Sequence, residues 1–270
     1  MKSFLFAAAA LALAFLTLPL AALFLRVPPR ELVDALGSDV ARDALLVSLK
    51  TNIVAEALIL LVGTPAAYFL ARRRFRGRAV VLTMLELPLV LPPAVGGIAL
   101  LAAFGRTGLL GGSLDTLGLR VPFTQTAVVL AVCFVAGPFY VRPAIAAFEA
   151  VDENVLDAAR TLGARPARVF GRVALPLAGA GLGAAGAIAF ARGLGEFGAT
   201  IMFAGSLQGV TQTLPLAIYA QFQRDFHVAL ALGALLVTIS FVLLLSIKLV
   251  PSWTRYALIS PFRSAPSSST

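Results

Sequence analysis

Two ionisable side chains, Arg192 and Glu196, interrupt an apolar segment of the sequence and are the first candidates for chemistry. They stand four residues apart, so on a helix they share one face and can pair. Ionisable groups inside an apolar span usually face the interior of a helix bundle or a wet path. Two interpretations therefore stay open: a structural ion pair that fixes helix packing, and a pair that lines a pore.

The chain has few residues that are suited to metal binding, disulfide formation or ATP binding. One histidine, His227, cannot build a multi-histidine metal site, and one cysteine, Cys133, cannot form an intramolecular disulfide. The sequence contains no G-x-x-x-x-G-K-[ST] phosphate-binding loop and so no recognisable ATP site. We expect no metal and no cofactor on this chain, and we expect it not to be an enzyme.

The composition is that of a membrane protein. Of the 270 residues, 59% are hydrophobic and 13% charged, and the mean hydropathy is +0.93. Soluble domains are about 45–50% apolar and about 25% charged. The net charge of +9 could indicate nucleic-acid binding. Because the basic residues cluster beside apolar segments, the positive-inside rule explains them better, and we expect no nucleic acid as a partner.

Six apolar segments are long enough to cross a membrane as helices, which takes roughly 20 residues. The first is longer than the apolar core of a signal peptide and no clear cleavage site follows, so we expect a retained helix. In the third, Glu86 precedes Pro88, where we expect the helix to break. We predict an all-α, polytopic membrane domain over residues 1–263 and a disordered tail over 264–270. The predicted spans are 4–25, 45–70, 79–104, 126–148, 177–204 and 227–250.

The basic residues between the spans predict the orientation. The loop between spans two and three carries five arginines and no acid, which places it in the cytoplasm. Counting spans from there puts both termini in the cytoplasm as well. The arginines of that loop are Arg72, Arg73, Arg74, Arg76 and Arg78. On the same side fall Arg160, Arg165, Arg168 and Arg172 of the fourth loop, and Lys248, Arg255 and Arg263 near the end.

A polar stretch at 149–176 separates the fourth and fifth spans. Asp152 is a suitable N-cap, Gly163 suits the left-handed end of a helix, and Pro166 suits the first turn of the next. We predict a small helix-turn-helix knob outside the bilayer. Its first helix has an apolar stripe of Val155, Ala158, Ala159 and Leu162. Its second helix has Arg165, Arg168 and Arg172 on one face and Val169, Phe170 and Val173 on another. By pattern alone, the stretch is equally an amphipathic surface loop whose arginines touch lipid phosphates.

The spacing within this stretch carries a resemblance to a known family. Asp157-Ala158-Ala159 is followed after three residues by Gly163, and after nine more by Val173-Ala174-Leu175-Pro176. This resembles the cytoplasmic "EAA" loop of ABC-importer permeases, with Asp157 where the family favours Glu and Val173 where it favours Ile. The resemblance implies a fold like that of type I ABC importer permeases. It also implies that the loop docks on a separate ATPase subunit, which holds ATP and Mg.

A second resemblance lies in and after the fifth span. The segments 195–200, Gly-Glu-Phe-Gly-Ala-Thr, and 211–215, Thr-Gln-Thr-Leu-Pro, resemble the molybdate branch of these permeases. Related sulfate permeases share the Gly-Glu-Phe-Gly part. The segments 87–93 and 63–67 support the match, whereas 223–226, Gln-Arg-Asp-Phe, depart from it. We place a candidate gate of the translocation pathway at Arg192, Gly195, Glu196, Phe197, Gly198 and Thr200.

The resemblance also implies the partners and the cellular location of this chain. We expect a homodimer of this chain, two ATPase subunits, an extracytoplasmic molybdate-binding protein and membrane lipid. The expected location is the cytoplasmic (inner) membrane of a bacterium or archaeon. Sulfate or tungstate is the alternative substrate. A secondary transporter is the alternative class, although such proteins often contain inverted repeats and this chain has no detectable repeat.

Overall fold

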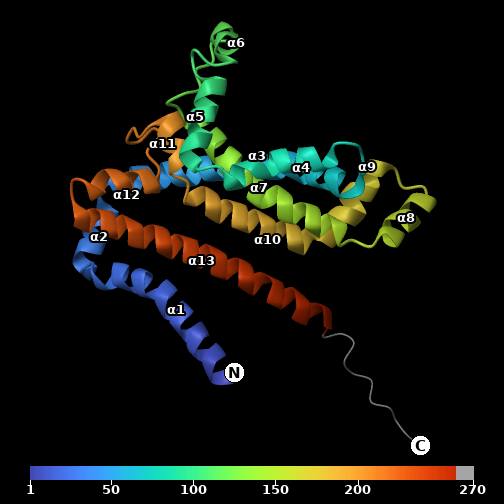
Figure 1. Cartoon of the computed structure of the whole chain (residues 1–270), viewed down its shortest axis with the longest axis horizontal. Coiled ribbons are helices and arrows are strands. Elements are labelled where there is room, and N and C mark those ends of the chain that lie inside the picture. Colours follow the sequence, from blue (N-terminus) through green and yellow to red (C-terminus); the bar gives the residue numbers. More distant parts are fainter. Residues whose placement is uncertain (260–270) are drawn as a thin grey trace, which may run out of the picture.

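The computed structural model describes residues 1–259, and over this range the chain is helical without strands (Figure 1). Arg263 and the predicted tail 264–270 lie outside the described residues, as do the side chains of Lys248 and Arg255. The helices are α1 Lys2–Leu25, α2 Pro29–Gly37, α3 Asp39–Arg72, α4 Arg78–Val90, α5 Pro93–Phe104, α6 Gly111–Thr116, α7 Gln125–Glu149, α8 Glu153–Thr161, α9 Pro166–Val169, the π-helix η1 Phe170–Ala174, α10 Leu175–Leu194, α11 Gly198–Ala204, α12 Leu214–Phe222 and α13 Phe226–Ile259.

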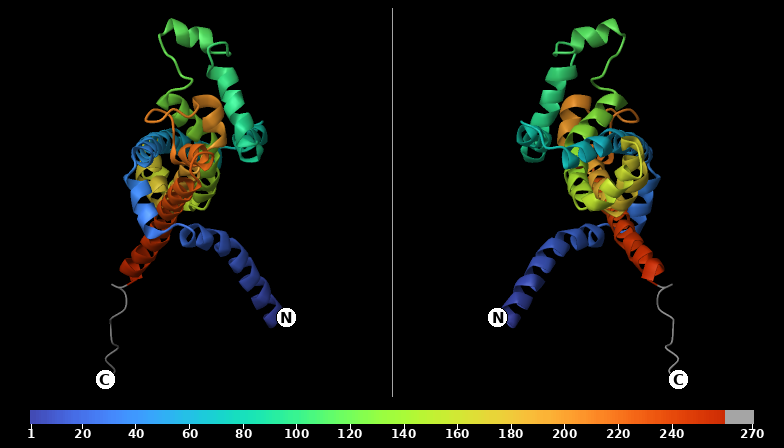
Figure 2. Two further views of the ribbon diagram at one scale, coloured as in Figure 1. Left: turned by 90° about the vertical axis from the view of Figure 1, so that its left-hand side faces the viewer. Right: turned by 90° about the vertical axis from the view of Figure 1, so that its right-hand side faces the viewer.

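Three long helices, α3, α7 and α10, pack side by side along the long axis of the molecule, with α7 the most buried of them (Figures 1 and 2). The helix α13 covers this group on one side through α10 and α12. At one end of the bundle α8 and α9 project, and at the other α2 and α12 turn back. The helix α1 meets α13 near its own C-terminal end, diverges from it toward the N-terminus and is exposed along its apolar length (Figures 1 and 2).

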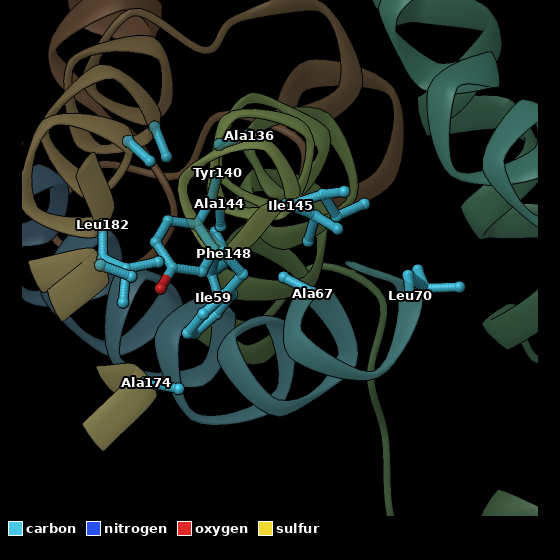
Figure 3. Packing of buried hydrophobic residues seen from close by; sticks show 14 of the residues in the cluster. Ile59, Ala67, Leu70, Ala136, Tyr140, Ala144, Ile145, Phe148, Ala174 and Leu182 are labelled. Atoms are coloured by element: carbon cyan, nitrogen blue, oxygen red, sulfur yellow. The ribbon is translucent and has the colours of Figure 1, made fainter. Parts of the chain in front are cut away.

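Small residues let the three central helices approach closely. Ala55 and Ala67 of α3, Ala136 and Ala144 of α7, and Ala189 of α10 are completely buried. Association of helices in lipid depends on such close packing, because hydrocarbon tails are as apolar as the side chains they would replace. Larger side chains of α7 fill the remaining space toward the α8 end, as Figure 3 shows for Tyr140, Ile145 and Phe148.

Buried polar side chains tie the helices together. Tyr140 of α7 shares a hydrogen bond with Thr64 of α3, with 2.6 Å between the two hydroxyl oxygens. Asn52 of α3 donates from Nδ2 to the carbonyl of Phe190 in α10 at 3.0 Å. Ser48 of α3 accepts from the backbone N–H of Leu214, the first residue of α12, at 2.7 Å. Such bonds offset the cost of placing polar groups in an apolar interior.

Two of the six predicted spans are broken in the structure, the third at a different residue from the one expected and the fifth where a continuous span was predicted. The span 79–104 consists of α4 and α5, bent by 117° at a short break. The break falls at Leu91 and Pro92 rather than at Pro88, which lies inside α4. A residue before proline is pushed out of the helical region, and Leu91 is extended with ψ 136°. The acid Glu86 pairs with Arg142 of α7.

The second broken span is 177–204. The helix α10 starts upstream of that range and ends at Leu194, and α11 begins only at Gly198. Among the described residues, five helices are apolar and long enough to cross a membrane, and the bent pair would make a sixth. The four remaining predicted spans fall within α1, α3, α7 and α13, whose helical ranges extend beyond them.

The contact between α3 and α10 predicts the effect of a small substitution. A Cβ at Gly193 would lie 2.2 Å from Oδ1 of Asn52 and 2.9 Å from a methyl of Val132, whereas one at Gly183 meets nothing within 4 Å. We expect Gly193→Ala to destabilise the detergent-purified protein by ~1–3 kcal/mol, the usual cost of overpacking. Gly183→Ala should not lower stability, since alanine favours helices. Thermal unfolding followed by size-exclusion chromatography checks both, and equal midpoints would contradict the packing.

Candidate coupling loop and gate residues

The segment 149–176, here called the knob, contains the two helices that its sequence predicts. Asp152 caps α8 by accepting from the N–H of Asn154 at 2.9 Å. Gly163 takes the left-handed conformation with φ +82°, which few residues other than glycine adopt easily. Pro166 is the first residue of α9. These predictions of local structure are confirmed.

A residue outside the predicted apolar stripe anchors the knob. Leu156 is completely buried in the cluster that α7 and α10 share. Of the predicted stripe, Val155, Ala158 and Leu162 are exposed, and Leu162 is 88% exposed. The stripe is thus an unoccupied apolar surface on the outside of the knob. Sequence reasoning missed Leu156 because a single buried leucine leaves no periodic signal in a nine-residue helix.

Asp157 and Ala159 lie beside this surface. The carboxylate of Asp157 is exposed and pairs with Arg160 one turn further on. That hydrogen bond raises the pKa of the Arg160 guanidinium, which stays charged in any case. An exposed pair of this kind contributes little to stability, so both side chains are free to exchange partners. Ala159 is half-buried against the core cluster.

The second half of the knob continues without interruption into the membrane. The helix α9 passes into η1, which contains Val173, and η1 passes into α10, which starts with Leu175 and Pro176. Proline cannot donate to the carbonyl four residues earlier and clashes with it in an α-helix. The π-turn accommodates this, because the N–H of Leu175 bonds instead to the carbonyl of Phe170, five residues back. The knob and α10 therefore form one rod.

The base of the knob is held by an arginine that sequence reasoning assigned only to membrane orientation. Arg72, at the end of α3, donates from Nη2 to the carbonyls of Phe148 and Val151 at 2.6 and 2.8 Å. It also lies 3.7 Å from the carboxylate of Glu153. The carbonyls at the end of a helix have no intrahelical donors, so a cation there satisfies them.

A second arginine reinforces this attachment. Arg78 donates to the carbonyl of Leu70 at 2.9 Å and to the carboxylate of Glu149 at 2.8 Å. The other three arginines of the predicted basic cluster are exposed: Arg73, Arg74 and Arg76. The sequence alone does not distinguish the two arginines that bind other parts of the fold from the three that are exposed.

The candidate gate begins with the predicted ion pair. Nη2 of Arg192 lies 2.8 Å from Oε2 of Glu196. The Glu196 side chain is 1% exposed and the Arg192 side chain 27% exposed, with its guanidinium over the ring of Phe139 in α7. The other carboxylate oxygen of Glu196 accepts from the N–H of Ala199 at 2.7 Å and so caps α11. The pair thus joins the end of α10 to the start of α11.

The other gate residues form the turn between these helices. Gly195 ends α10, and the ring of Phe197 lies 5.2 Å from that of Tyr219 in α12. A Cβ at Gly198 would lie 2.8 Å from Pro93 of α5, so α11 packs tightly on α5. Thr200 is completely buried, and its hydroxyl has no hydrogen-bond partner among the described residues. The structure brings the gate residues together at one helix junction, at the opposite end of α10 from the knob.

Comparison with known proteins decides the family. The profile of the family described as "Binding-protein-dependent transport system inner membrane component" matches residues 63–256, most of the chain. The chain belongs to this family. The match includes the whole knob and the candidate gate.

Individual members of the family are close in sequence. A Mycobacterium tuberculosis protein named "Molybdenum transport system permease protein ModB" is 45% identical over 86% of this chain and 88% of its own length. A protein of the same name from Escherichia coli (strain K12) is 43% identical over 67% of this chain and 80% of its own. A Haloferax volcanii protein named as a probable molybdenum ABC transporter permease is 40% identical over 82% and 81%.

Solved structures of ABC transporters share the fold. A crystal structure of a bacterial alginate ABC transporter in complex with its pentasaccharide-bound periplasmic protein superposes with a TM-score of 0.67. It is 18% identical and covers 91% of this chain and 93% of its own. An inward-facing structure of the MetNI methionine ABC transporter has a TM-score of 0.58, 18% identity and coverage of 78% and 94%. The fold is all-α and like that of type I ABC importer permeases.

The clamp by Arg72 predicts a difference between neighbouring arginines. Arg72→Met removes one donor from each of two carbonyls while keeping an apolar stem, and the Phe148 carbonyl keeps a second donor, the N–H of Val151. Arg73→Met changes only an exposed side chain. Unsatisfied buried acceptors cost ~1–3 kcal/mol each, so we expect amide exchange across 150–162 to accelerate roughly tenfold or more in Arg72→Met. Hydrogen exchange measured by mass spectrometry checks this. Identical exchange in the two variants would contradict a clamp at Arg72.

Proposed function

We propose that this chain is the permease subunit of an ATP-driven importer that moves molybdate across the cytoplasmic membrane. The observation that carries the proposal is the 45% identity, over 86% of the chain, to a relative named as a molybdenum transport permease. A dianionic oxyanion cannot cross hydrocarbon unaided, because an unpaired charge there is far too costly. It needs a protein path with alternating access.

The geometry of the knob supports docking on a separate ATPase subunit. Its outer surface is apolar and unoccupied, with Leu162 projecting from a rigid helix pair. Its second helix is continuous with α10, so a displacement of the knob moves α10 as a rod. Two ATPase subunits would bind ATP and Mg, and this chain would hydrolyse nothing itself. In this arrangement the knob and both termini lie in the cytoplasm.

The remaining partners follow from the same scheme. A second copy of this chain would complete the pore about a two-fold axis, and the fully exposed apolar length of α1 is suited to cover by lipid or by that copy. An extracytoplasmic binding protein would deliver molybdate and carry most of the selectivity. The candidate gate pair, Arg192 and Glu196, would hold α10 against α11 while the path is closed.

Reconstitution of the whole assembly tests the proposal. The chain, its ATPase and its binding protein are placed in liposomes, and ATP-dependent uptake of molybdate is measured with tungstate and sulfate as competitors. We expect uptake that requires ATP and the loaded binding protein. Preferential uptake of sulfate would show that sulfate and not molybdate is the substrate. Uptake that needs no ATPase would show that the protein is a secondary transporter and not an ABC permease.

Docking on the knob predicts opposite outcomes for two matched substitutions. Leu162 and Leu109 are both about nine-tenths exposed, one on the knob and one in the loop between α5 and α6. Burying a leucine contributes ~1.5–3 kcal/mol, so Leu162→Asp should weaken binding of the ATPase by roughly tenfold or more. Leu109→Asp should leave it unchanged. Co-purification of the ATPase with the tagged chain measures both effects. Equal ATPase yield from the two variants would show that the knob is not part of the docking surface.

The gate pair makes a separate prediction. Glu196→Gln keeps the cap on Ala199 but removes the charge that faces Arg192. The two charges lie 2.8 Å apart without hydrogen-bond geometry, so their attraction is coulombic, and loss of the charge should raise basal ATP hydrolysis or substrate leak roughly tenfold. Asp115→Asn, which breaks an exposed pair with Arg106, is the control. Unchanged leak and hydrolysis in Glu196→Gln would leave the pair a purely structural one.

A further inference from the structure

An ion pair outside the candidate gate lies on the surface of the bundle at membrane depth. Nε of Arg142 in α7 lies 3.0 Å from Oε1 of Glu86 in α4. The two side chains are 57% and 39% exposed. Beside them is a shallow hollow between α4 and α7, lined by Leu82, Leu85, Pro138, Val141 and Ile145 as well as by the pair itself.

The position of the pair along the helices places it inside the span. Arg142 precedes the end of α7 by seven residues, and Glu86 follows the start of α4 by eight. At about 1.5 Å per residue, the pair lies roughly 10–12 Å from the knob end of both helices. The other strongly exposed ion pairs of the described residues, Arg106–Asp115 and Asp157–Arg160, lie outside the long apolar helices.

This depth decides what the surface meets. Ionisable side chains in a membrane are costly against lipid and turn toward a bundle interior or a water-filled path. Here the interior of the chain is on the opposite side of the pair, because more than half of the Arg142 side chain is uncovered. The exposed side of α7 at Arg142 therefore faces a wet path in the assembled protein.

A second cation lies close to the same path. The guanidinium of Arg192 stands 5.8 Å from the ring centroid of Phe139, which precedes Arg142 by about one turn of α7. Arg192 remains 27% exposed although its acid partner is buried. Two arginines thus lie beside one another at α7, Arg192 of α10 over Phe139 and Arg142 of α7 itself. Each pairs with a carboxylate, Glu196 four residues further on in one case and Glu86 of α4 in the other.

The free atoms of Arg142 fit one class of ligand. The ion pair with Glu86 is made through Nε, and among the described residues Nη1 and Nη2 make no hydrogen bond. The planar fork of an arginine binds two oxygens of a tetrahedral oxyanion through parallel N–H bonds. The carboxylate of Glu86 balances the charge when no anion is bound and keeps the guanidinium pointed along the path.

We propose that Arg142 is an anion-binding station of the translocation path, which takes a dianionic tetrahedral oxyanion on its free fork while Glu86 positions it. The inference rests on the proposed function, because it requires that an oxyanion pass along α7. A station differs from a purely structural pair in one respect. Removing the arginine abolishes binding, whereas removing the carboxylate only frees the arginine.

The first experiment compares the two halves of the pair in the reconstituted complex. We expect Arg142→Gln to lower molybdate uptake at least roughly tenfold, for the loss of a charge-assisted bidentate contact, with ATPase stimulation by the loaded binding protein retained. Glu86→Gln should keep most of the uptake, and Arg142→Lys should fall between them. Arg106→Gln, a change in an exposed loop, is the control. Equal losses in Arg142→Gln and Glu86→Gln would overturn the station and leave a structural pair.

The second experiment asks whether position 142 faces water, independently of any transport. In a Cys133→Ala background, Arg142→Cys and Leu61→Cys are treated with a hydrophilic, anionic methanethiosulfonate in proteoliposomes holding the whole complex. Leu61 is a strongly exposed apolar residue of α3 and serves as the lipid-facing reference. We expect Arg142→Cys to react much faster. Equal labelling rates would overturn the proposal even if the wild type transports molybdate. Fast labelling of position 142 in a complex that transports no molybdate would instead show that the proposed function is wrong.

Discussion

The interior of a bilayer offers no hydrogen bonds, so each polar group within a span must find its partner in the protein. In this chain that constraint determines which helices touch. Ser48 and Asn52 of α3 reach backbone groups of α12 and α10, and Tyr140 of α7 reaches Thr64. Each bond crosses between helices that are distant in sequence. Alanines and glycines at the contacts allow the approach that these short side chains require.

The same constraint explains how the ends of the long helices are held. Arg72 donates to one carbonyl in the last turn of α7 and to another just after it, and Glu196 accepts from the N–H of Ala199 in the first turn of α11. Both side chains also carry a charge partner, Glu153 in one case and Arg192 in the other. Helix ends are where the bundle can change shape at least cost, because few packed contacts must break. Ionic caps at these ends fix the positions of the helices without changing how the middle of each helix packs.

Local features of the sequence predicted local features of the structure well. Asp152, Gly163 and Pro166 each occur where their backbone chemistry is required, and Arg192 and Glu196 pair as their spacing predicts. The functional roles assigned to the loop and the gate remain predictions. What could not be predicted depends on packing between distant segments. Pro88 is tolerated inside α4 whereas Pro92 ends it, and both prolines lie in equally apolar sequence. Arg72 looked identical to its neighbours, because position inside the fold and not residue type gives it two carbonyls to bind.

The exposed leucine on the knob has a consequence beyond transport. Leu162 stands at the end of α8, where 88% of it is exposed. An apolar surface that is exposed on a subunit without its partner is a site for non-specific association with other apolar surfaces. A permease that has found its ATPase would hide this residue, and one that has not would display it. The surface suited to transmitting force would then also be the surface through which unpaired subunits aggregate.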